Sequence, residues 1–163
     1  VKKDMEFPFL PRFGLRLFLD QSLDRVRYCG MGPDESYPDK HQASWHGIFE
    51  GDVRAMHRPY LKPQEYGSHW DCSWCELSGE EMSFQTSSKE GFMFQACEYT
   101  QEELSEKAHD FELKEAGCTV LCLDHNQSGI GSGSCGPQLL EKYQFNEPEF
   151  SRTWVITPGK RKE

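Results

Sequence analysis

A glycine-rich and serine-rich stretch holds the residues whose types and order most suggest a site. Residues 124–137 read Asp-His-Asn-Gln-Ser-Gly-Ile-Gly-Ser-Gly-Ser-Cys-Gly-Pro and follow an apolar run. Glycine reaches positive φ angles and lets the backbone approach a ligand closely, so this composition predicts a loop with a specific path, not a helix or a regular strand. Ile130 and Cys135 would be unusual in a flexible linker, which favours a functional loop over a merely mobile one.

Cys135 also raises the possibility of thiol catalysis, with His125 as its base. Such a nucleophile needs a base that a third group holds in place. The two residues are ten positions apart, and no third orienting group is evident. The sequence therefore disfavours nucleophilic catalysis here.

Seven cysteines, an odd number, are scattered among apolar residues in a chain large enough to fold without disulfides, so we expect reduced, mostly buried thiols. Cys72 and Cys75 have the CxxC spacing of a redox pair or of half a zinc site. Cys118, Cys122 and His125 would supply the other half, but their spacing matches no common zinc motif. The residues around the CxxC pair alternate as in a strand, which would place its two thiols on opposite faces. Metal binding and redox chemistry are therefore disfavoured.

Three acidic residues, Asp34, Glu35 and Asp39, lie in a loop bounded by prolines. Two carboxyl groups in different environments can serve as general acid and general base. Nothing nearby in the sequence would desolvate one of them. The sequence thus favours a turn in which Asp34 and Asp39 accept hydrogen bonds from local backbone amides while Lys40 balances the charge.

The segment from residue 41 to 78 is rich in aromatic residues and histidine: Trp45, His46, Phe49, His57, Tyr60, Tyr66, His69, Trp70 and Trp74. Aromatic faces bind sugars, but they fill protein cores more often. His57 and His69 have no third ligand at a telling spacing. We therefore expect both to be surface or core-edge histidines.

Alternating apolar residues predict an all-β chain with one short helix. The expected strands cover residues 13–19, 25–29, 70–77, 82–86, 91–99, 118–124, 139–145 and 153–157. The first two should form an antiparallel pair, and residues 87–91 should form a turn between two further strands. Thr100 followed by Glu103 predicts a capping box, which starts a helix near residues 101–109.

Length and charge limit the possible partners. The 163 residues suit one domain, and the net charge of −9 argues against nucleic acid or an anionic membrane as a partner. No apolar run approaches the ~20 residues that span a bilayer, and no secretory signal is evident at the start. We expect a soluble, cytoplasmic protein. Because the chain begins at Val1, we also expect it to be a fragment or a processed product.

Four collinear motifs carry a family resemblance. They are Leu10-Pro-Arg-Phe-Gly-Leu, Gly30-Met-Gly-Pro-Asp-Glu-Ser-Tyr-Pro-Asp-Lys40, Pro59-Tyr60 with Pro63-Gln-Glu-Tyr-Gly67, and Gly129-Ile-Gly-Ser-Gly-Ser-Cys-Gly-Pro137. Over roughly residues 8 to 157 the chain resembles the C-terminal end, or small chain, of large bacterial β-galactosidases of glycoside hydrolase family two. The resemblance implies an antiparallel super-sandwich similar to galactose mutarotase. Residues 1–163 would form a single domain, the C-terminal part of that super-sandwich.

The resemblance also implies a function for the parent enzyme. That family hydrolyses terminal β-D-galactose from lactose-type substrates with retention, using two glutamates about 5 Å apart on a (β/α)₈ barrel. No segment here matches either catalytic motif, so this chain alone is expected to be inactive and none of its acids catalytic. Any Mg²⁺ or Na⁺ would bind elsewhere in the parent enzyme. The implied partners are the β-galactoside, the rest of the enzyme including its barrel, and further copies in a homo-oligomer.

For the glycine-rich loop, the resemblance implies a place near the sugar. Some family members have a tryptophan there that stacks on the sugar; the matching position is Cys135, whose thiol offers no flat apolar face. Ser132, Ser134 and Asn126 could bond hydroxyls or water. A free-standing carbohydrate-binding module and a purely structural sandwich are the alternatives. If strands outside the chain complete the sandwich, apolar surface or unpaired edges should be exposed here.

Overall fold

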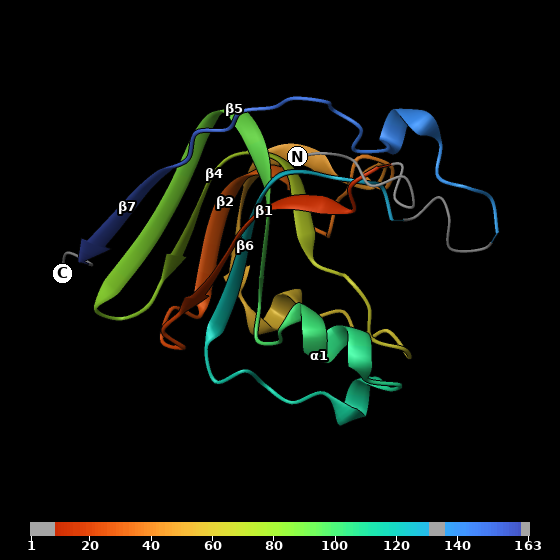
Figure 1. The fold of residues 1–163 in the computed structure, drawn as a ribbon. Helices are drawn as coiled ribbons and strands as arrows, with labels where there is room; N and C mark the ends of the chain where they lie inside the picture. The colour runs from red at the N-terminus through yellow and green to blue at the C-terminus, as the bar shows by residue number, and fades with distance from the viewer. Residues whose placement is uncertain (1–8, 131–135, 161–163) are drawn as a thin grey trace.

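The computed structural model describes residues 9–130 and 136–160. Within these ranges the chain forms one antiparallel sheet in the order β1-β6-β5-β4-β2-β3, with β7 paired to β5 (Figure 1). The strands are β1 (Arg12–Leu19), β2 (Arg25–Gly32), β3 (Trp45–Asp52), β4 (Ser68–Ser78), β5 (Met82–Cys97), β6 (Thr119–Gln127) and β7 (Val155–Lys160). The expectation of an all-β antiparallel fold with one short helix is confirmed.

Strand β5 connects the two parts of the sheet. On one side it pairs with β4; on the other, Met82–Ser87 pairs with β7 and Met93–Cys97 with β6. The predicted turn at residues 87–91 is wrong, because the strand continues through this stretch. Gly91 has a φ of 71°, which suits glycine, and β4 accommodates the irregularity with two register shifts.

The first two strands do not pair with each other, which corrects a second prediction. β1 pairs with β6, whereas β2 pairs with β3 and β4. Leu23, in the connection between β1 and β2, is buried in the core, and its carbonyl accepts a hydrogen bond of 3.1 Å from the Thr119 hydroxyl. The connection therefore enters the core and carries the chain to the other part of the sheet instead of closing a hairpin.

The main core lies along one face of the sheet, where alternate residues of the strands meet. Its buried members include Val26, Tyr28, Leu77, Phe92, Phe94, Leu121 and Leu123. Strand β6 is buried on both faces, as its apolar run predicted. It also continues through Asp124 to Gln127, so the predicted loop begins only at Ser128. The core strand thus delivers the chain directly to the base of that loop.

Helix α1 (Gln101–Glu106) covers part of the opposite face (Figure 1). The Thr100 hydroxyl accepts a hydrogen bond of 3.1 Å from the Glu103 amide, which confirms the predicted N-cap. The Glu103 carboxylate accepts from the Lys114 amide instead, at 2.9 Å. Leu104 is buried in a cluster with Val120, and burial of a leucine side chain stabilises the helix by about 2 kcal/mol.

The end of the described chain differs in part from the prediction. Residues 139–145 do not form a strand; they contain a 3₁₀ turn at Glu141–Tyr143 and end at the buried Phe145, which forms an isolated bridge with Leu10. The last expected strand is present as β7. Large apolar side chains are exposed on several strands: Phe18 57%, Trp45 60%, Ile48 58% and Val155 58%. Within the described residues, no helix is long and apolar enough to cross a membrane.

Candidate functional site

The first stem of the glycine-rich loop is tied to distant parts of the chain. The Ser128 amide donates to the Pro11 carbonyl at 2.9 Å, and its hydroxyl donates to the Leu10 carbonyl at 2.7 Å. The same hydroxyl accepts from the Phe145 amide at 2.9 Å, and the Gly129 amide donates to the Tyr143 carbonyl at 2.9 Å. Residues 128 and 145 are thus neighbours and form a closed neck, at which the chain leaves the sheet and returns to it.

Asp39 holds the same stem from another side. Its Oδ1 accepts a hydrogen bond of 3.0 Å from the Ile130 amide, 91 positions away. A Cβ added at Gly129 would lie 2.3 Å from Asp39 Cγ, so only glycine permits this approach. The predicted role of Asp39, bonding local amides, misses this long-range contact. The signal available in the sequence was that the Asp39 motif and the glycine loop belong to the same family resemblance.

The other two acids of this segment are also paired with side chains. Asp34 binds Arg58 at the surface, which corrects the predicted bond to local amides. Glu35 is buried and accepts from Lys40, from the Tyr60 hydroxyl and from the Gly67 amide at 2.8 Å. Burial alone would raise the pKa of Glu35, but these hydrogen bonds outweigh it and hold the pKa below its ordinary value. Glu35 is a structural anchor, and Lys40 balances its charge.

Arg12 fixes β1 to β6 immediately before the loop. Its guanidinium binds both oxygens of Asp124 and also Glu65 Oε2, at 2.8 Å for the latter. Burial opposes the charge on Arg12, but the two carboxylates raise its pKa above the ordinary value. This ion cluster fixes the position of the strand that leads into the loop.

Both ring nitrogens of His125 are engaged, which argues against a role as a base for Cys135. Nδ1 accepts from Arg152 Nε at 2.9 Å, because an arginine can only donate. Nε2 therefore carries the proton and donates to Glu147 Oε2 at 3.1 Å. The ring is buried and stacks on Phe150, with centroids 4.5 Å apart. His125 thus joins β6 to the segment that follows the loop.

Asn126 is the one predicted substrate-binding residue that the described ranges include. Its Oδ1 accepts from the Gln127 amide at 2.8 Å, and its Nδ2 donates to Glu147 Oε1 at 3.3 Å. The other three, Ser132, Ser134 and Cys135, lie outside the described residues. The structure therefore places Asn126 two residues before the loop and brings it beside Glu147.

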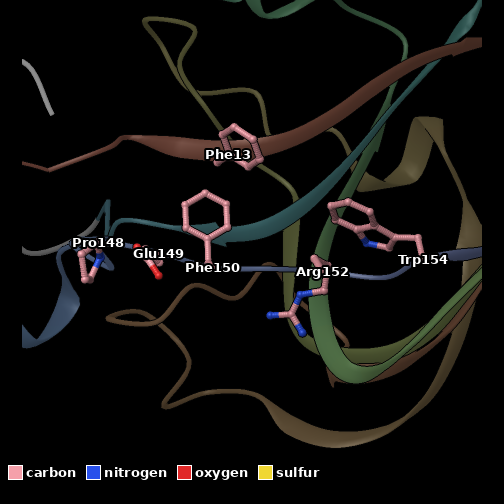
Figure 2. A pocket seen from close by; sticks show the side chains of 6 residues that line it. All are labelled: Phe13, Pro148, Glu149, Phe150, Arg152 and Trp154. Carbon is pink, nitrogen blue, oxygen red and sulfur yellow. The ribbon is translucent and has the colours of Figure 1, made fainter. Parts of the chain in front are cut away.

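Two adjoining cavities, which share Arg152, lie next to His125. The first, of about 340 Å³, is lined by Phe13, Pro148, Glu149, Phe150, Arg152 and Trp154 (Figure 2). Figure 2 shows Phe150 and Trp154 directed toward the strand of Phe13, whereas Arg152 is directed away from it. The second cavity, of about 160 Å³, contains Trp70, Asp71, Glu90 and Asn126 among its walls. The aromatic lining was not predictable from the sequence, because Phe13 lies near the start of the chain and Phe150 and Trp154 lie near its end.

The aromatic residues and histidines of the segment from 41 to 78 are divided between the core and the surface, where Trp45 is 60% exposed. Tyr66 and His69 are buried, and Phe49 packs against the main core cluster. His57 Nε2 lies 2.9 Å from Asp110 Oδ1, and its ring packs against Tyr66. His57 is half-buried and fits the expected position at the edge of the core. His69 is fully buried against Tyr28 and Phe94, so the expected surface or core-edge position is wrong for that residue.

The cysteines in the described ranges are free thiols. Cys72 and Cys75 both enter the main core, so the prediction of opposite faces is wrong. The register shift between Cys72 and Trp74 interrupts the alternation of side chains between the two faces of the sheet. Asp71, in the same irregular stretch, has a φ of 53°. Burial raises the pKa of both thiols well above the ordinary value. Among the described residues, no group of three or more His, Cys, Asp or Glu is placed to hold a metal ion.

Comparison with known proteins assigns the family. A family model described as beta galactosidase small chain matches residues 1–156. The β-galactosidase of Actinobacillus pleuropneumoniae is 46% identical over 145 residues, which are 89% of this chain and 14% of that protein. The β-galactosidase of Staphylococcus xylosus is 39% identical over 153 residues, 93% of this chain and 15% of that protein. The β-galactosidase of Kluyveromyces lactis is 33% identical over 149 residues, 88% of this chain and 14% of that protein.

These relatives are much longer than the chain, which spans about 15% of the length of those it matches. The match nevertheless covers nearly all of the chain and includes the residues that hold the glycine-rich loop. The chain therefore belongs to the β-galactosidase small-chain family.

Proposed function

We propose that the chain is the non-catalytic C-terminal part of a β-galactosidase that hydrolyses terminal β-D-galactose from lactose-type substrates with retention. Its contribution is a loop held near the active site, while the two reacting carboxylates belong to another part of the enzyme. One observation carries this proposal: the stem of the glycine-rich loop is fixed by Asp39 and Ser128. A loop of purely connecting function would not need such long-range anchors.

The proposed substrate contacts are Cys135, Ser134, Ser132 and Asn126. Small side chains and glycines let backbone amides approach a sugar, and hydroxyl and amide groups match its hydroxyls as donors or acceptors. Cys135 would contribute a small wall, without the stacking energy of an aromatic ring.

The exposed apolar side chains support a proposal about partners. Trp45 and Ile48 on β3, Phe18 on β1 and Val155 on β7 are each more than half exposed, and large apolar side chains left exposed in this way are candidate contacts with other protein surfaces. We assign this role to the rest of the β-galactosidase, including its barrel, in a cytoplasmic enzyme that could form homo-oligomers. Any magnesium or sodium ion of the enzyme would bind outside residues 1–163, which act as a single domain.

The test compares the chain alone with the complete enzyme on a chromogenic β-galactoside. The chain alone should release no product, whereas the complete enzyme should be active. A complete enzyme in which Ser132, Ser134 and Cys135 are replaced together by alanine should lose substrate affinity. Turnover by the isolated chain, or unchanged kinetics after the loop replacement, would contradict the proposal.

A free-standing carbohydrate-binding module is the second candidate, and the cavity lined by Phe13, Phe150 and Trp154 favours it. Aromatic walls beside charged groups suit a pyranose ring, whose C–H face packs on a ring while its hydroxyls form hydrogen bonds. Titration of the chain with galactose, followed by NMR of the Trp154 indole, tests this candidate. Absence of shifts at tens of millimolar galactose would exclude it.

A further inference from the structure

We propose that Asp39 is a positioning residue for the glycine-rich loop: its carboxylate fixes the backbone at Gly129 and Ile130 and so sets the direction in which the chain enters the loop. The kinetic part of this inference rests on the proposed function. The structural part depends only on contacts between described residues.

The contact is specific in its chemistry. A backbone N–H can only donate and an ionised carboxylate can only accept, so the bond from Ile130 N to Asp39 Oδ1 is charge-assisted. Asp39 also packs closely against the neighbouring residue, Gly129. The absent side chain of Gly129 leaves the space that Asp39 occupies, and a Cβ there would lie 2.3 Å and 2.6 Å from Asp39 Cγ and Oδ2. The position of Asp39 therefore requires a glycine at residue 129.

The backbone around Asp39 is held rigidly. Tyr37 is fully buried, and Tyr37 and Lys40 exchange backbone hydrogen bonds of 2.9 Å and 3.0 Å around Asp39. Ser36 is buried as well, and its amide donates to the Ser68 carbonyl of β4 at 2.7 Å. Glu35 adds its contacts to Tyr60 and Gly67. Asp39 thus acts from a fixed frame that the sheet supports, which is what a positioning group requires.

The first stem of the loop has two anchors on different sides. Ser128 ties it to Leu10 and Phe145, while Asp39 ties it to the loop that follows β2. The Gly129 amide is held next, by the Tyr143 carbonyl at 2.9 Å. Asp39 then holds the following peptide, at Ile130, and so extends the fixed backbone of the stem by one residue.

The main test replaces Asp39 in the complete enzyme. Asp39→Ala removes the acceptor, so kcat/KM should fall about tenfold, mostly through KM, since the loop stem is no longer fixed. Asp39→Asn keeps an acceptor oxygen and should recover most of the loss. Asp34→Ala is the matched control: it lies on the same loop, its side chain is exposed and binds Arg58, and it should leave the kinetics unchanged.

Hydrogen exchange gives a readout that does not depend on activity. In Asp39→Ala, peptides that contain Ile130 should exchange about tenfold faster, while peptides from β5 keep their protection. Gly129→Ala serves as a second variant, because it disturbs the same contact with the carboxylate intact, and it should show the same local change.

The possible results separate the two proposals. Unchanged exchange at Ile130 in both variants would overturn the positioning role. Faster exchange with unchanged kinetics would support the positioning role and count against the proposed contact between loop and substrate. Faster exchange with a raised KM, recovered in Asp39→Asn, would support both. Loss of protection throughout β5 as well would identify Asp39 as a general folding residue and overturn the proposal.

Discussion

Acid should destabilise the chain through one buried histidine. The ring of His69 lies between Tyr28, 4.3 Å away between centroids, and Phe94, 5.2 Å away, and is almost fully buried. Its Nδ1 is 3.2 Å from the Met31 carbonyl, which can only accept, so Nδ1 carries a proton and donates to it. Burial lowers the pKa of His69 from 6.5 to about 4, although the bond to Met31 opposes this change.

The sign and size of the effect follow from this pKa. Between pH 6.5 and about 4 the unfolded chain binds a proton at His69 and the native chain does not, so stability falls as the pH falls through this range. At about 1.4 kcal/mol per pH unit, the free energy of unfolding should decrease by about 3 kcal/mol. Above pH 6.5 this residue contributes no pH dependence.

The assay is urea unfolding of the chain at pH 7.5, 6, 5 and 4, compared with His69→Phe. The variant keeps an aromatic ring but cannot titrate, so the difference between the two proteins isolates His69 from the carboxyl groups. The difference in unfolding free energy should shift by about 3 kcal/mol in favour of the variant from pH 7.5 to pH 4. A difference that does not change with pH would refute the reasoning.

Three further predictions concern stability and reactivity. Ser128→Ala should lower the free energy of unfolding by about 2 kcal/mol, because it leaves a buried amide and a carbonyl without their partner; a loss under about 0.5 kcal/mol in urea unfolding would show that the neck is not held this way. Thr100→Ala should cost about 1 kcal/mol through loss of the N-cap, with Thr100→Asn as the control that retains the stability. Cys72 and Cys75 should resist a thiol reagent in the native chain and react after unfolding, since burial raises the pKa of both thiols; rapid labelling of either in the native chain would contradict the buried placement.

Local patterns predicted the elements better than their connections. Alternation marked β4 and the apolar run marked β6, because side-chain period and burial are local properties of the sequence. The partner of β1 was not predictable in this way, since β6 lies about a hundred residues away and the deciding feature is a buried leucine in a turn. The strand predicted at residues 139–145 is absent for a related reason: one buried side chain, Phe145, fixes an otherwise irregular segment.

The candidate site, like the fold, was predictable only where its residues carry a local signal. Composition alone predicted a loop over residues 124–137, because glycine and serine favour turns and irregular backbone. The structure starts that loop at Ser128, and residues 131–135 lie outside the described ranges. It could not find Asp39 or Ser128 as anchors, since each acts through a contact with a residue far along the chain. Nor could it show that Phe13 and Phe150 come together at 4.8 Å beside His125. Those pairings depend on the sheet order and on the return of the chain after the loop.

The most direct test of the central claim is a structure of the complete enzyme with a bound β-galactoside. We expect residues 129–137 to face the sugar, Asp39 still to hold the Ile130 amide, and both reacting carboxylates to come from outside this chain. A structure in which this loop lies on a surface remote from the sugar, or in which an acid of this chain touches the anomeric carbon, would contradict it.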